Sequence, residues 1–216
     1  MKLVNLALFA IPAFLFAREP LAPGDETPAM DASTAARDPL TAGQKVTRRA
    51  LRLVEPLTLF SSSFGAGVDQ LRNLPSQWGQ ESEGYARRFA SAEGYTAAHN
   101  TVALGFDLVF HLDPRYRRMP QRGFGSRLWN AVSQTFIANT DSGGRMINVS
   151  EIAGNFGAGF VSNSWQPAGH DSTNDALTRA AVGLAFHTVK NAAREFLPDF
   201  LHHAGHKRSS EQDPDE

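Results

Sequence analysis

Phe156-Gly157-Ala158-Gly159-Phe160 is the stretch of sequence that decides the fold, and Phe64-Gly65-Ala66-Gly67-Val68 is nearly a second copy of it. Neither stretch alternates polar and apolar residues as a half-buried strand does. Glycine inside a helix costs about 1 kcal/mol relative to alanine, so four helical glycines require a compensating gain. We therefore expect Gly65, Gly67, Gly157 and Gly159 to lie where helices pack at close range.

Close helix packing of this kind has two interpretations. The helices cross inside a water-soluble bundle, or they associate within or against a lipid bilayer, where small residues are common at helix interfaces. The charge distribution argues against a bilayer span, because the longest uncharged stretch, residues 152–170, contains two asparagines, a glutamine and a proline. Contact with a membrane surface stays open.

Helical segments are expected on both sides of these stretches. Thr41 and Gln44 have the spacing of a capping box, and apolar residues then recur at helical spacing. A proline at 114 ends one segment, and Asp141 to Gly144 has the composition of a turn. The expected helices span about 41–54, 57–71, 81–111, 125–139, 150–165 and 173–196. Few windows alternate with period two, so we predict an all-α fold, a compact multi-helix bundle.

The composition bounds the classes of function. The chain has 216 residues, 42% of them apolar, with no cysteine and with 21 Lys and Arg against 22 Asp and Glu. This is enough for one domain with its own core. The missing cysteines exclude disulfide scaffolds, cysteine-ligated metal centres and thiol nucleophiles. The near-neutral charge argues against nucleic acid as a partner.

The N-terminal residues predict export. Met1-Lys2 precedes an apolar run, residues 3–16, that is shorter than a bilayer-spanning helix and ends in an acceptable cleavage sequence at Ala17. A retained anchor or a buried helix is the alternative. We expect residues 1–17 to be a signal peptide, 18–43 a disordered acidic Pro- and Ala-rich linker, 44–203 the helical domain and 204–216 a disordered tail. The mature protein is then expected in the periplasm or the outer envelope.

An arginine-rich segment is the strongest candidate for a binding surface. Residues 115–127 hold no acid, and their arginines are interleaved with Tyr116, Met119 and Phe124. The arginines are Arg115, Arg117, Arg118, Arg122 and Arg127. Basic residues among aromatic ones suit an anionic membrane surface or another polyanion. The alternative is a solvated loop.

Residues that carry chemistry are few. The chain has no Gly-x-Ser-x-Gly, no phosphate-binding glycine loop and no His-Glu-x-x-His. Asp107 and His111 are one helical turn apart and share a face with His99, so they offer a metal pair or a carboxylate-oriented base. A third ligand would have to be His187 or Glu151. The alternative is that these residues hydrogen-bond between helices, and we expect no cofactor and no metal.

Arginines and carboxylates also gather near the expected helix ends. Such pairs tie loops onto a bundle by bidentate hydrogen bonds, and we expect that role here. The alternative is a polar pocket around Asp107, His111 and Glu151, which would make the protein an enzyme or a small-ligand binder. Three histidines next to the predicted tail are expected to bind metals only adventitiously. They are His202, His203 and His206.

Five short sequence motifs follow one another within residues 56–200. They are Trp78-Gly79-Gln80, Glu83 to Ser91, Asp113-Pro114-Arg115-Tyr116, Thr140 to Arg145 and Phe156 to Phe160. Together they resemble a family of exported bacterial helical proteins to which no activity is assigned. Arg117 and Gln166-Pro167 depart from that pattern, which has an aromatic residue and Tyr-Pro there.

The resemblance implies export and a single shared domain, and it implies no chemistry. Combined with the arginine-rich segment, it predicts a non-enzymatic, cell-envelope-associated protein. Its partners are expected to be an anionic membrane surface or another envelope protein.

Overall fold

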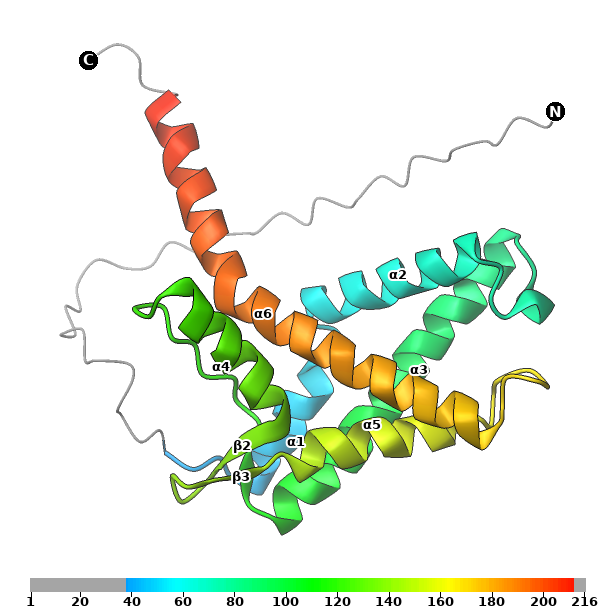
Figure 1. Ribbon diagram of the computed structural model, residues 1–216, viewed down its shortest axis with the longest axis horizontal. Helices are drawn as coiled ribbons and strands as arrows, with labels where there is room; N and C mark the ends of the chain where they lie inside the picture. The colour runs from blue at the N-terminus through cyan, green and yellow to red at the C-terminus, as the bar shows by residue number, and fades with distance from the viewer. Residues whose placement is uncertain (1–37, 212–216) are drawn as a thin grey trace. The chain divides into compact units, whose positions relative to one another are not determined.

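The computed structural model describes residues 38–211, with side chains described as far as residue 201. Six α-helices and a small three-stranded sheet form this part of the chain (Figure 1). The all-α prediction is confirmed. The predicted signal peptide and most of the predicted linker lie outside the described residues. In the described part, no helix combines the length and the apolar composition that a membrane crossing needs.

Local sequence signals set where helices begin. α1 (Ala42–Leu51) follows Thr41, whose hydroxyl accepts from the Gln44 N–H while the Gln44 side chain accepts from the Thr41 N–H, as the capping-box spacing predicts. Pro56 opens α2 (Pro56–Leu71), at a position where the helix needs no N–H donor. Asn148 caps α5 (Val149–Ser162) by accepting from the Glu151 N–H.

The remaining elements are the 3-10 turn η1 (Ser76–Trp78), α3 (Ser82–Val109), α4 (Phe124–Phe136), α6 (Thr173–Glu211) and the sheet. Strands β1 (Leu112–Asp113), β2 (Ile137–Thr140) and β3 (Arg145–Ile147) pair antiparallel in the order β1-β2-β3. The sequence does not predict this sheet, and residues 137–139 were expected to be helical. The expected turn at residues 141–144 connects β2 to β3, with Gly143 at a φ of +85°.

The last helix continues where the sequence predicts an end. Pro198 is expected to stop it, but α6 runs through this proline to Glu211, and so it includes residues 204–211 of the predicted disordered tail. A proline inside a helix leaves a carbonyl in the preceding turn without its helical partner. At Pro198 that carbonyl belongs to Arg194, four residues earlier. Arg118 and Arg127 donate hydrogen bonds of 2.9 and 2.5 Å to the next carbonyl along the chain, that of Glu195, and so hold this turn from outside the helix.

The two glycine stretches differ in how they pack. In α5, a Cβ added to Gly157 would lie 3.0 Å from the side chain of Val102, and one added to Gly159 would collide with the Ala176 carbonyl of α6. These two glycines therefore lie at close helix crossings. In α2, a Cβ added to Gly65 or Gly67 would meet no atom within 4 Å, so the prediction of a close crossing there is wrong.

The interior of the described part is polar. Its buried apolar residues are small apart from one leucine: Ala66, Ala103, Leu112, Ala131, Ala138, Ala158, Ala176 and Ala180. Buried beside them are charged residues such as Lys45, Arg49, Arg88, Glu151 and Glu195, whereas large apolar residues are numerous among the exposed ones. Buried ion pairs stabilise a fold weakly because desolvation opposes their attraction. The individual hydrogen bonds of these buried polar groups therefore matter for the fold.

Candidate functional site

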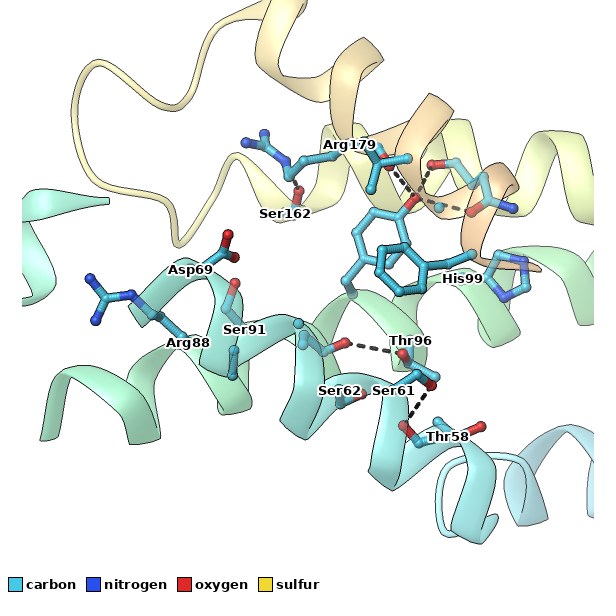
Figure 2. A pocket seen from close by; sticks show the side chains of 18 of the residues that line it. Thr58, Ser61, Ser62, Asp69, Arg88, Ser91, Thr96, His99, Ser162 and Arg179 are labelled. Atoms are coloured by element: carbon cyan, nitrogen blue, oxygen red, sulfur yellow. Dashed lines mark hydrogen bonds between the residues drawn. The ribbon is translucent and has the colours of Figure 1, made fainter. Parts of the chain in front are cut away.

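A cavity of about 450 Å³ is lined by residues of α2, α3, α5 and α6. Figure 2 shows Ser162 and Arg179 on one wall and Thr58, Ser62 and Asp69 on the other. The cavity is within the size range of small-molecule sites. It stays open partly because α2 lines it with small residues, among them Ser61, Ser62, Gly65 and Ala66.

Six cationic side chains line this cavity. They are Arg52, Arg72, Arg88, Arg179, Lys190 and Arg194. Among the described residues of the lining, Asp69 is the one residue with a carboxylate. Arg88 is held by neutral oxygens, since it donates to the carbonyls of Leu74, Pro75 and Gly79 and to the Gln70 side chain. The cavity therefore has an excess of positive charge.

Three of these cations, Arg52, Lys190 and Arg194, form a cluster that we call the cationic cluster. Arg194 pairs with Glu55 at 2.7 Å. Arg52 donates to the Pro114 carbonyl at 2.5 Å and lies 3.4 Å from a Glu151 oxygen. Lys190 differs from both, because within residues 38–201 its ammonium has neither a hydrogen bond nor an ion pair.

Burial and neighbouring positive charges lower the pKa values of Lys190 and Arg52. Burial, followed by the charges of Arg194 and Arg52, lowers the pKa of Lys190. Burial and the neighbouring charges of Arg49 and Arg194 lower the pKa of Arg52 to about 10. An anion bound beside these groups would favour their charged forms and offset the repulsion.

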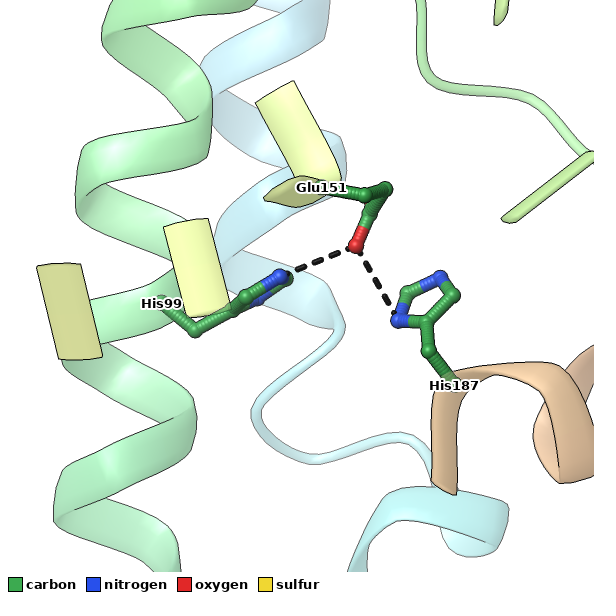
Figure 3. Close-up of side chains that lie close together, drawn as sticks. All are labelled: His99, Glu151 and His187. Carbon is green, nitrogen blue, oxygen red and sulfur yellow. Dashed lines mark ion pairs between the residues drawn. The ribbon is translucent and has the colours of Figure 1, made fainter. Parts of the chain in front are cut away.

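The side chains of His99 of α3, Glu151 of α5 and His187 of α6 point toward one another (Figure 3). Glu151 Oε2 lies 2.9 Å from His99 Nε2 and 3.0 Å from His187 Nδ1. All three residues are buried, and both histidines line the cavity. The sequence placed these residues among the candidate ligands, but it could not show that this trio, rather than one with Asp107 and His111, comes together.

The second oxygen of Glu151 faces arginine. Arg49 Nη1 donates to Glu151 Oε1 at 3.1 Å, and Arg49 Nε donates to Asp107 Oδ2 at 2.7 Å. Burial alone would raise the pKa of Glu151, but His187, His99 and Arg49 together hold it well below its ordinary value. Burial also lowers the pKa of His187 well below its ordinary value and outweighs the attraction of Glu151. The carboxylate is thus ionised near pH 7.

The predicted convergence of Asp107, His111 and Glu151 is wrong in one member. Arg49 joins the buried carboxylates of Asp107 and Glu151. His111 lies beyond the end of α3 with a φ of +53°, so the one-turn spacing to Asp107 does not apply. Its side chain is 80% exposed, and its Nδ1 is 4.0 Å from Asp141.

The arginine-rich segment is tied to the protein by carboxylates. Arg115 and Arg117 lie 2.8 and 3.8 Å from Asp113, and Arg118 and Arg127 lie 2.8 and 2.5 Å from Asp199 of α6. Arg122 is exposed, and no ion pair to it occurs in the described part of the chain. Most of the positive charge that we expected to face a polyanion is therefore compensated within the protein.

A residue that the sequence did not single out, Glu195, organises this segment. It is fully buried and accepts hydrogen bonds from Tyr116, Met119, Arg127 and Asn130 at 2.8 to 3.2 Å. The spacing of four that connects His187, Asn191, Glu195 and Asp199 places them on one face of α6. The first three of these are buried, so the recurrence of polar residues every four positions was the available signal.

A comparison of the chain with known protein families, with curated proteins and with solved structures finds no match in any of the three. The family resemblance described above therefore stays a prediction, and the function has to be inferred from the geometry of the site.

Proposed function

We propose that this protein, exported as its N-terminal residues predict, binds a small organic anion in the cavity between α2, α3, α5 and α6. The unpartnered ammonium of Lys190 in a lining rich in cations is the observation that carries the proposal. The ligand's carboxylate or phosphate group lies at the cationic cluster, and its apolar part lies along Ala66, Val182 and Phe186. The sequence analysis offered a small-ligand binder as its alternative function, and we now place the ligand in this cavity instead of around His111.

The charge of the lining favours an anion over a neutral ligand. A half-buried cation without a partner is costly, because it gives up hydration and receives no compensating interaction. Two guanidinium groups next to Lys190 increase that cost, as the lowered pKa of Lys190 indicates. Phosphate and carboxylate oxygens accept charge-assisted hydrogen bonds from all three groups. An anionic ligand therefore offsets a cost that the ligand-free protein carries.

Isothermal titration calorimetry with two probes, octanoate and phenyl phosphate, tests this proposal and distinguishes the two anionic groups. We expect Lys190→Gln to weaken binding of the preferred probe by about tenfold or more, because one charge-assisted hydrogen bond contributes about 1.5–3 kcal/mol. Neutral 1-octanol should bind more weakly than octanoate. Arg145→Gln removes an exposed arginine outside the cavity and should leave affinity unchanged. Equal affinities for wild type and Lys190→Gln would contradict the proposal.

A second function, contact with a membrane surface, is favoured by exposed apolar side chains on and just before α4. Phe124 is 69% exposed and Trp129 is 70% exposed, and Met119 and Leu128 are also exposed. Exposed aromatic residues next to an unpaired arginine suit the interface between lipid headgroups and acyl chains. We propose that the predicted envelope association uses these apolar side chains, with Arg122 as the basic residue beside them, rather than the whole arginine-rich segment.

Co-sedimentation with vesicles of phosphatidylglycerol and phosphatidylethanolamine tests this contact. The double variant Phe124→Ser, Trp129→Ser should lower the bound fraction severalfold, since burial of each aromatic side chain contributes about 1.5–3 kcal/mol. Phe60→Ser removes an aromatic residue of similar exposure, 66%, from α2 and serves as the matched control. The contact is refuted if wild type does not sediment with vesicles, or if both variants lose the same fraction.

A further inference from the structure

Two buried atoms where α3 meets α5 lack a hydrogen bond. Glu151 Oε2 and His99 Nε2 are 2.9 Å apart, yet within the described residues neither has a partner in hydrogen-bonding geometry. Proteins leave few buried polar atoms unsatisfied. A metal ion between them would satisfy both, because it accepts lone pairs from the carboxylate and from the imidazole without requiring an N–H aimed at oxygen.

The donor atoms have the arrangement of metal ligands. One ligand atom each from His99, Glu151 and His187 lies within 4.8 Å of the other two. The two short distances, 2.9 and 3.0 Å, are close to the roughly 3.3 Å that separates ligands bonded at about 2.0–2.1 Å to a tetrahedral ion. Two imidazoles and one carboxylate suit zinc and other first-row transition metals, whereas Mg²⁺ and Ca²⁺ prefer oxygen ligands only.

Arg49 acts as a positioning residue for this donor set. It donates to Glu151 Oε1 and to Asp107, so the carboxylate is held with Oε2 toward the two histidines. Groups outside the ligand set commonly fix ligand orientation in this way. We infer that His99, Glu151 and His187 bind one divalent transition-metal ion and leave a coordination position open toward the cavity, which both histidines line.

The metal site does not depend on the proposed anion site, but it lies next to it. The charges of Arg49 and Arg52 are balanced by those of Asp107 and Glu151, so a divalent ion would add two positive charges beside Lys190. An anion at the open position would compensate them. We therefore expect Zn²⁺ to strengthen octanoate binding, whereas the absence of anion binding would leave the metal inference intact.

The test uses the full chain with His202, His203 and His206 changed to alanine, so that histidines outside the described side chains cannot bind the probe. After treatment with a chelator, titration with Zn²⁺ should show one bound ion per chain, and excess Mg²⁺ should not displace it. Co²⁺ should give the intense visible absorption of a four- or five-coordinate ion. A weak spectrum like that of hydrated Co²⁺, or the absence of Zn²⁺ binding, would overturn the inference.

Substitutions locate the ion. Glu151→Gln and His187→Ala should each lower Zn²⁺ affinity by about 100-fold or more, since changes even beyond the ligands cost about 10–100-fold. His111→Ala removes an exposed histidine and should have no effect. Circular dichroism checks that each variant folds, and the Co²⁺ spectrum of the unsubstituted site decides the question if one does not. Stoichiometric Zn²⁺ binding by both folded ligand variants would refute the assignment.

Discussion

Two buried glutamates of this protein, Glu195 and Glu151, have opposite surroundings. Glu195 accepts hydrogen bonds on both oxygens, with Oε1 taking the Met119 N–H and Arg127, and Oε2 taking Tyr116 and Asn130. Glu151 accepts from arginine on Oε1, but its Oε2 has no hydrogen bond within the described part. The protein therefore satisfies both oxygens of Glu195 with hydrogen bonds, whereas it leaves one oxygen of Glu151 without a hydrogen-bond donor.

The difference extends to the space around each glutamate. Donors from the arginine-rich segment and α4 surround Glu195 on α6 and hold that segment in place. Two histidines that line the cavity flank Glu151. A polar interior can thus contain one carboxylate whose hydrogen bonds are all satisfied and another with an unsatisfied oxygen next to a cavity, and we assign only the second to the proposed binding role.

Removal of the closed carboxylate should have the largest effect on stability. Glu195→Ala removes the buried carboxylate that accepts from Arg127 and three other donors, so we expect a loss of about 3–5 kcal/mol in the free energy of unfolding. Urea denaturation measures it. Glu83→Ala is the matched control, because Glu83 pairs with Arg87 on the surface and such pairs contribute at most about 1 kcal/mol. Equal losses of unfolding free energy in the two variants would contradict a structural role for Glu195.

Glycines offer a second comparison of closed and open regions. Gly159→Ala places a Cβ against the Ala176 backbone, and we expect it to cost about 1–3 kcal/mol, as overpacking does. Gly65→Ala points into free space beside the cavity and should be neutral or stabilise by up to about 1 kcal/mol through helix propensity. Thermal unfolding of both variants checks this pair. A larger loss at Gly65 than at Gly159 would contradict the described packing.

The smallest effect is expected at Lys190, and its sign is the informative part. Lys190→Met removes a desolvated cation that has no partner within residues 38–201, so the ligand-free protein should gain about 0.5–1 kcal/mol of stability. Binding of anions should weaken in the same variant. A clear loss of stability instead would mean that Lys190 has a structural partner, and the proposed anion site would lose its main support.

Much of the fold could be predicted because its signals are local. The capping box at Thr41, the helix start at Pro56 and the turn before Arg145 all depend on neighbours within four residues. The sheet was missed because its strands are only two to four residues long, too short for a period to be recognised. Pro198 was misjudged because Arg118 and Arg127, distant in the sequence, donate to the Glu195 carbonyl in the turn before it.

The site was predictable only as a set of candidates. His99, Glu151 and His187 were all considered, but their sequence positions do not reveal which side chains meet, because each lies on a different helix. His111 was chosen on helical spacing, which fails once α3 ends at Val109. The cavity has no linear signature, since its residues come mainly from four helices and share no residue type.

Equilibrium unfolding with and without Zn²⁺ tests most directly whether Glu151 belongs to a ligand site. Wild type and Glu151→Gln are compared, both without the three histidines at 202, 203 and 206. At a Zn²⁺ concentration about 100 times the dissociation constant, wild type should gain about 2.7 kcal/mol and the variant almost nothing. An equal gain in both proteins, or none in wild type, would contradict the assignment of Glu151 as the open member of the pair.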